Sequence, residues 1–170
     1  MKDGKSRCTW ADVDDTLMVN YHDEEYGVRR TGLTAYFEKL CLESFQAGLS
    51  WRCILHKREE FRKCFHGFDP YRVCNMTDGD LGILMENKGI VRNRRKIEAV
   101  IKNAKITIAI EKEMGYENYI NAFTDGGLLS KDMKKKGFSF VGPTICWEYL
   151  TSIGLLTAHE EFCYKYEPLA

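Results

Sequence analysis

The sequence contains few of the features that interrupt helices or place a chain in a membrane. Only three prolines occur in 170 residues, and no segment alternates regularly between apolar and polar residues, so a β-rich fold is not expected. No run approaches the roughly 18 consecutive apolar residues of a membrane span. No apolar stretch follows Met1 as it would in a signal peptide. These absences predict a soluble, unexported protein without membrane contact.

The sequence also has a formal net charge of zero. The 25 Lys and Arg residues balance the 25 Asp and Glu residues, which excludes a uniformly basic protein of the histone type. Basic residues are instead concentrated in residues 86–105, where seven bases accompany two acids, and again in residues 131–136. A nucleic-acid partner would therefore have to bind a local basic patch.

The cysteine content argues against a disulfide scaffold. Seven cysteines are spread from Cys8 to Cys163, in a chain large enough to form a core without disulfides. Reduced thiols or metal ligands are the better interpretation, and both are typical of the cytoplasm. Five cysteines stand beside apolar residues and are expected to be small buried hydrophobes. They are Cys41, Cys53, Cys64, Cys74 and Cys146.

Apolar residues recur at i, i+3 and i+4 over most of the chain, which predicts an all-α fold. The length fits one domain, residues 1–170. Gly48 and Gly89 are expected to end two of the helices. The expected helices are Thr34–Ala47, Glu59–Phe65, Tyr71–Asn75, Thr77–Met85, a long helix from Val91 or Arg92 to Met114, Leu128–Lys136 and Thr144–Leu156.

A metal site is suggested by His159 and Cys163, which are four residues apart. If residues 158–164 are helical, both side chains leave the same face and form half of a site. Cys8 and His22, near the other end of the chain, would complete a Cys2His2 tetrahedron and tie both termini to the domain. The alternative is a surface histidine and a core cysteine without metal.

Glu43 is the most informative acid in the chain. On a helical wheel it lies roughly 20° from Tyr36 and roughly 60° from Leu40, so its carboxylate is on the apolar face of its helix. A carboxylate there needs a partner such as an arginine, or it forms the anionic wall of a pocket for a cationic ligand. Tyr21 and Trp51 would supply aromatic walls for such a pocket, with core packing as the alternative.

The segment between residues 87 and 93 joins two expected helices by a short apolar hairpin. The N-terminus of the second helix combines free backbone N–H groups with basic side chains, which suits a DNA phosphate. A solvated basic surface is the alternative. The candidate DNA contacts are Lys88, Gly89, Arg92, Arg94 and Lys96.

Several runs of sequence are more specific than these spacings. They are residues 21–28, 42–51, 57–59, 64–70, 89–92, 96–97, 134–146 and 154–159. The most distinctive are Gln-Ala-Gly-Leu-Ser-Trp, which ends at Trp51, and Phe-Val-Gly-Pro-Thr, which ends at Thr144. Together and in this order, the runs resemble the family of bacterial 3-methyladenine DNA glycosylases of type I, over most of the chain.

The resemblance implies a helix-hairpin-helix fold and one structural zinc ion that joins the N- and C-termini. It implies a monofunctional base-excision enzyme that flips 3-methyladenine out of alkylated double-stranded DNA and hydrolyses its N-glycosidic bond. We expect a monomer in the bacterial cytoplasm. Glu43 falls on the family's catalytic carboxylate, and Glu43, Tyr21 and Trp51 fall on its base-binding positions. The positions of the zinc ligands are taken by Cys8, His22, His159 and Cys163.

The sequence also departs from the family's pattern. Met18 stands where a second pocket tyrosine is common, and the segment between Lys105 and Lys134 is shorter than usual. No second carboxylate is clearly paired with Glu43. Two other functions therefore stay open. One is a DNA-binding relative that excises poorly or not at all. The other is a zinc hydrolase that uses a metal-bound water.

Overall fold

The computed structural model describes residues 3–168 and contains no β-strand within them, which confirms the all-α expectation. A π-helical turn, Tyr21–Glu25, continues the first helix, and a short 3-10 turn, His66–Phe68, follows the third. The α-helices are α1 (Thr16–Asn20), α2 (Leu33–Gln46), α3 (Trp51–Cys64), α4 (Pro70–Val73), α5 (Asp78–Glu86), α6 (Arg94–Met114), α7 (Tyr116–Asn121), α8 (Gly126–Lys135) and α9 (Pro143–Ser152).

The helix boundaries differ most from expectation at α3, which begins at Trp51 rather than Glu59. Ser50 explains the early start, because its hydroxyl accepts a hydrogen bond from the backbone N–H of Cys53 and caps the helix. The short helices α1 and α7 were not expected. Asp15 caps α1 in the same way, and Gly115 with φ +82° provides the turn between α6 and α7.

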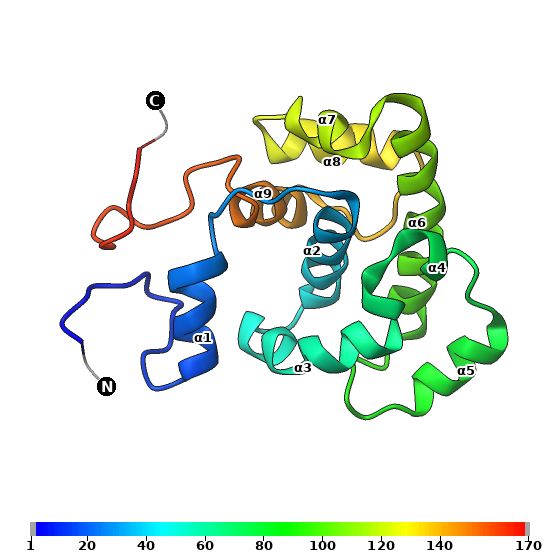
Figure 1. Ribbon diagram of the computed structural model, residues 1–170, viewed down its shortest axis with the longest axis horizontal. Coiled ribbons are helices and arrows are strands. Elements are labelled where there is room, and N and C mark those ends of the chain that lie inside the picture. The colour runs from blue at the N-terminus through cyan, green and yellow to red at the C-terminus, as the bar shows by residue number, and fades with distance from the viewer. Residues whose placement is uncertain (1–2, 169–170) are drawn as a thin grey trace.

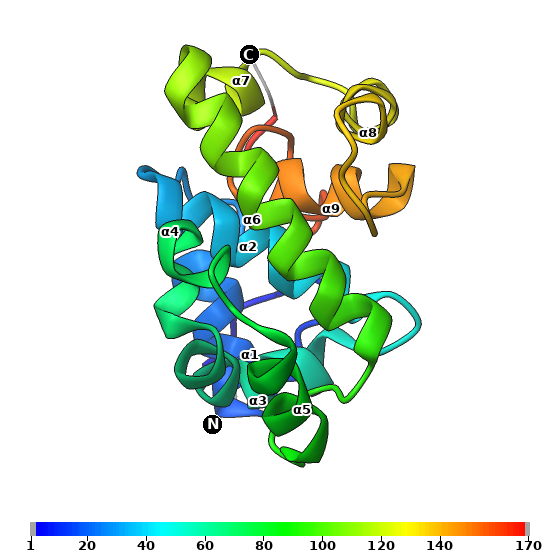
Figure 2. The same ribbon diagram turned by 90° about the vertical axis from the view of Figure 1, so that its right-hand side faces the viewer.

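Helix α2 lies between two hydrophobic clusters. Phe37 and Phe45 pack into the cluster shared with α3, α4, α5 and α6. Tyr36 and Leu40 pack into the other, which includes residues of α7, α8 and α9. Figures 1 and 2 show α2 at the centre of the molecule, with the long helix α6 crossing beside it. Apolar residues therefore surround α2 on two sides, which places its polar residues deep in the protein.

Both ends of the described chain lie on the side of the molecule opposite α5, and the N-terminal end lies beside α1 (Figure 1). The backbone N–H of Tyr164 donates to the carbonyl of Ser6 at 2.9 Å, and the hydroxyl of Ser6 donates to the carbonyl of Phe162 at 2.7 Å. Residues 158–164 are not helical but form turns and bends, so the condition under which His159 and Cys163 would share a helical face is not met. None of the helices between residues 3 and 168 combines the length and apolarity of a bilayer span.

Helices α8 and α9 approach closely at Gly126, which is buried. A Cβ atom added there would lie 2.5 Å from the backbone nitrogen of Trp147 and 2.6 Å from its Cα. Backbone atoms cannot move aside as a flexible side chain can, so only glycine fits this position.

We therefore expect Gly126→Ala to lower the free energy of unfolding by about 2 kcal/mol or more. Gly82→Ala in α5 is the control, because its added Cβ would meet nothing within 4 Å. This change should stabilise the protein by about 0.5–1 kcal/mol through helix propensity. Urea denaturation measures both, and equal effects of the two substitutions would contradict the packing argument.

Candidate active site and metal centre

A cavity of about 480 Å³ opens where α2, α3 and α9 meet the N-terminal segment. Its wall combines carboxylates with aromatic rings, which is the combination that the sequence suggests for a cationic ligand. The lining residues include Met18, Tyr21, Tyr26, Glu43, Trp51 and Glu148. The predicted base-binding residues Tyr21, Glu43 and Trp51 are thus brought together.

The π-helical turn gives two adjacent residues different surroundings. Tyr21 and His22 are both buried, at 3% and 0% exposure. Tyr21 faces the cavity, whereas His22 lies among the cysteine and histidine side chains of the two chain ends. A single turn therefore connects the cavity to the candidate metal centre, and π-helical turns are frequent at functional sites.

Glu43 is buried, with 3% of its surface exposed, as its position on the apolar face predicts. Its partner is Lys39, one turn earlier on α2, whose Nζ lies 3.6 Å from Oε1 of Glu43. Burial raises the pKa of Glu43 and lowers the pKa of Lys39, while the attraction between the two charges opposes both shifts. The sequence analysis did not identify Lys39, although the i, i+4 spacing of opposite charges was a usable signal.

The Lys39 ammonium also contacts the aromatic wall. It donates to the Tyr21 hydroxyl and lies 4.4 Å from the centre of the Tyr21 ring and 4.2 Å from that of Trp51. The two ring centres are only 4.9 Å apart, whereas a base stacked between them would need about 7 Å. Tyr21 and Trp51 therefore form one wall, and a base in the cavity would contact that wall from one side.

The four predicted metal ligands converge, with their ligand atoms within 4.8 Å of one another. Nε2 of His22 and Nδ1 of His159 are 3.2 Å apart, and the sulfur of Cys163 lies 3.4 and 3.6 Å from them. The sulfur of Cys8 lies 3.5 Å from Nδ1 of His159. An ideal tetrahedral zinc site has N···N edges of about 3.3 Å and N···S edges of about 3.6 Å. The donor set therefore fits zinc.

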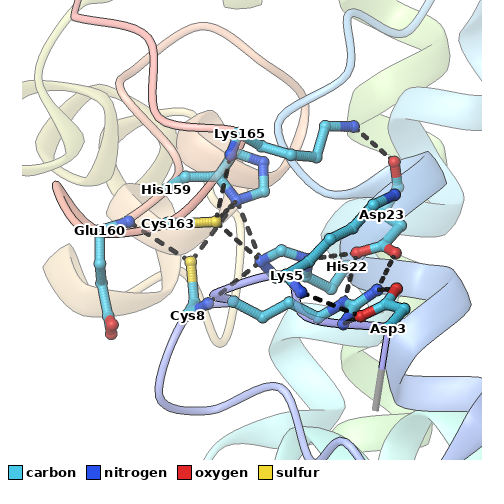
Figure 3. Close-up of polar contacts among 10 residues, drawn as sticks. Asp3, Lys5, Cys8, His22, Asp23, His159, Glu160, Cys163 and Lys165 are labelled. Atoms are coloured by element: carbon cyan, nitrogen blue, oxygen red, sulfur yellow. Dashed lines mark hydrogen bonds and ion pairs between the residues drawn. The ribbon is translucent and has the colours of Figure 1, made fainter. Parts of the chain in front are cut away.

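Surrounding groups orient these ligands, as Figure 3 shows. The Asp23 carboxylate lies 2.7 Å from Nδ1 of His22, so that Nε2 faces the cluster, and Arg7 holds Asp23 in turn. Backbone N–H groups donate to both sulfurs, from Glu160 to Cys8 at 3.3 Å and from Lys165 to Cys163 at 3.4 Å. Burial lowers the pKa of both histidines, which favours the neutral imidazole that binds metal.

The hairpin between α5 and α6 has the predicted position. The side chain of Asn87 accepts from the backbone N–H of Gly89 at 2.8 Å, and Ile90 is buried beneath the turn. Lys88 and Arg92 are exposed, and Asn93 caps α6 by accepting from the N–H of Lys96. Arg94 is also exposed and pairs with Glu98 at 2.9 Å.

Lys96 is a correction to the predicted DNA contacts. Its side chain points inward, with 6% exposure, and Nζ donates to the carbonyls of Phe45 at 2.7 Å and Ala47 at 2.6 Å. These carbonyls lie at the C-terminal end of α2, where a cation also interacts favourably with the helix dipole. Lys96 therefore anchors the helix that carries Glu43 and is not placed to bind a phosphate.

Comparison with known proteins identifies the family. A family model described as methyladenine glycosylase matches residues 10–128 and 126–166. The chain belongs to this family. The two matched segments meet at residues 126–128, inside the segment that the sequence identifies as shortened.

Members of the methyladenine glycosylase family are similar to this chain over nearly its whole length. The DNA-3-methyladenine glycosylase of Haemophilus influenzae is 37% identical, over 93% of this chain and 96% of that protein. A crystal structure of a 3-methyladenine DNA glycosylase I has a TM-score of 0.90 at 38% identity and covers 95% of this chain and 100% of its own. The Staphylococcus aureus enzyme, solved to explain 3-methyladenine recognition, has a TM-score of 0.86 at 32% identity, with 96% and 98% covered.

The inward position of Lys96 predicts a stability effect. Lys96→Met removes two charge-assisted hydrogen bonds and should lower the free energy of unfolding by about 3 kcal/mol. Arg92→Met in the same basic segment is the control, and this exposed position should change stability by no more than about 0.5 kcal/mol. Chemical denaturation of the two variants tests the assignment, which fails if both are as stable as the parent.

Proposed function

We propose that this chain is a monofunctional DNA-3-methyladenine glycosylase, which hydrolyses the N-glycosidic bond of 3-methyladenine in alkylated double-stranded DNA and leaves an abasic site. The observation that carries the proposal is the buried Glu43 carboxylate in a cavity walled by Tyr21 and Trp51, in a chain of the methyladenine glycosylase family. Homologues named for this activity cover more than nine-tenths of the chain.

The chemistry requires little from a general acid. A duplex hides its bases, so the damaged nucleotide must first leave the stack. Methylation at N3 makes the adenine cationic while it is bound to the sugar, and this weakens the C1′–N9 bond. When that bond breaks, its electron pair stays with the base. Water then adds to C1′ and loses a proton. A carboxylate and an aromatic wall are therefore sufficient to bind and select the base.

Glu43 is proposed to accept hydrogen bonds from the N–H groups of the extruded adenine. The wall formed by Tyr21 and Trp51 would contact the base from one side, as the close spacing of the two rings requires. The indole Nε1 of Trp51 is buried and, within residues 3–168, has no hydrogen-bond partner. Lys88, Gly89, Arg92 and Arg94 at the hairpin are proposed to contact the DNA backbone.

We also propose that Cys8, His22, His159 and Cys163 bind one zinc ion. The spacing of the four ligand atoms and the backbone N–H donors on both sulfurs support this. Four protein ligands leave no position for a reactive water, so the ion would be structural. It would hold the two chain ends together beside Tyr21. We also propose a cytoplasmic location, which the seven free cysteines support because thiols stay reduced there, and a monomer as the working state.

Substitution of Glu43 tests the role of its carboxylate. Glu43→Gln should reduce the release of 3-methyladenine from methylated duplex DNA by roughly a hundredfold or more, because the neutral amide no longer complements a cationic base. The variant should keep its helical circular dichroism spectrum and its affinity for DNA. No release by the parent protein, with DNA binding intact, would instead favour the DNA-binding relative.

Metal analysis and substitution of a ligand test the proposed zinc site. Elemental analysis should find one zinc ion per chain, and Cys163→Ala should lower the free energy of unfolding by about 3 kcal/mol or more. Cys53→Ala is the control, because Cys53 is half-buried and outside the cluster. If chelation abolished excision without changing the melting temperature, and Cys163→Ala remained stable and active, the zinc-hydrolase alternative would replace the structural role.

A further inference from the structure

A lysine ammonium lies against the wall of the cavity, close to Glu43. Lys39 is 7% exposed, lies 3.6 Å from the Glu43 carboxylate and covers the faces of both Tyr21 and Trp51. Because the ammonium lies beside Glu43, it already partly satisfies the attraction of that carboxylate for a cation. The Lys39–Glu43 pair as a whole is neutral, so it cannot by itself give the cavity a negative charge.

A second carboxylate, Glu148, lines the same cavity from α9. It is half-buried, and the structure places neither a hydrogen-bond donor nor a close ion-pair partner on it among residues 3–168. Burial raises the pKa of both Glu43 and Glu148. The negative charge of Glu148 adds to the rise at Glu43, and the positive charge of Lys39 opposes the rise at Glu148. The three charged groups therefore interact across the α2–α9 contact.

The other charged groups nearby are engaged elsewhere. Arg52, on the cavity wall, donates to Asp15 at 2.7 Å. The Glu160 carboxylate, at an exposed rim, accepts from the backbone N–H and hydroxyl of Thr9 at 2.8 and 2.7 Å. On the far side of Lys39, the Glu25 carboxylate binds Arg58 and Arg30. Glu148 is thus the carboxylate on the cavity wall that is left without a direct partner in the described chain.

We infer that Glu148 is a specificity-determining residue, which supplies the net negative charge by which the cavity prefers a cationic purine over a neutral one. Lys39, Glu43 and Glu148 carry one positive and two negative formal charges, so this trio has a net charge of minus one. Bringing in one cationic base makes the trio neutral, whereas a normal purine leaves the unpartnered carboxylate uncompensated. This role rests on the proposed glycosylase function and defines how that site selects its substrate.

Two free purines test the charge preference directly. The first is 3,9-dimethyladeninium, a fixed cation with methyl groups at N3 and at the sugar-bearing N9. The second is 3-methyladenine, which is largely neutral slightly above neutral pH. Binding is followed by the fluorescence of the tryptophans in the cavity wall. Glu148→Gln should lower the affinity for the cation about tenfold, the effect of one partly screened charge, and should change the affinity for the neutral base by less than about twofold.

A charge-balance variant separates this role from a structural one. Lys39→Met combined with Glu148→Gln leaves Glu43 as the single charge of the trio and again gives a net charge of minus one. The double variant should recover most of the lost preference for the cation. Glu113→Gln is the matched control, since Glu113 is exposed on α6 outside the cavity lining, and it should leave both affinities unchanged.

The inference is overturned if Glu148→Gln binds the cation as the parent does, or if the double variant loses more affinity than Glu148→Gln alone while its melting temperature is unchanged. The same variants are assayed for release of 3-methyladenine from methylated duplex DNA. If the parent releases none, the proposed function fails. If the parent releases the base and Glu148→Gln is equally selective, only the inference about Glu148 fails.

Discussion

The burial of the Glu43 carboxylate on α2 is the constraint on which the rest of the site depends. Removing a carboxylate and an ammonium from water costs several kcal/mol per ion, and the attraction between Lys39 and Glu43 offsets only part of this. The packing of α2 between two hydrophobic clusters holds the pair in place. Lys96 adds to this by binding the carbonyls at the end of the helix. Stability elsewhere in the fold thus maintains an unfavourable charge arrangement at the cavity.

The candidate metal centre, like the packing of α2, helps to position a residue of the cavity. Its four ligands come from the two ends of the described chain, and one of them, His22, directly follows Tyr21. Any group that holds His22 also fixes the π-helical turn that directs Tyr21 toward the cavity. A closed metal site can therefore contribute to base binding without taking part in the chemistry. This relation explains why ligands so far apart in sequence serve one small pocket.

The charge at the cavity depends on Lys39, Glu43 and Glu148 together rather than on any one of them. Glu43 alone would suggest a simple match between a carboxylate and a cationic base. With Lys39 beside it the pair is neutral, and Glu148 on the opposite helix alters the balance again. Because half-buried charges interact through a medium less polar than water, we infer that one additional carboxylate on the same cavity wall is sufficient to change which base is favoured.

The sequence by itself determined the helical class, the position of Glu43 on an apolar face and the candidate set of cysteine and histidine ligands, because these depend on periodicity and on motifs that are local in the chain. It did not distinguish Lys96 from Arg92 and Arg94, since neighbouring residues of a basic segment look alike until packing decides which of them faces inward. It related His159 to Cys163 only on the condition that residues 158–164 were helical, whereas turns bring the two side chains together. Only the tertiary structure decided that Lys39 contacts two aromatic rings and that Glu148 lines the same cavity as Glu43. Both arrangements require α2, α3 and α9 to pack together, and no spacing within one helix encodes that packing.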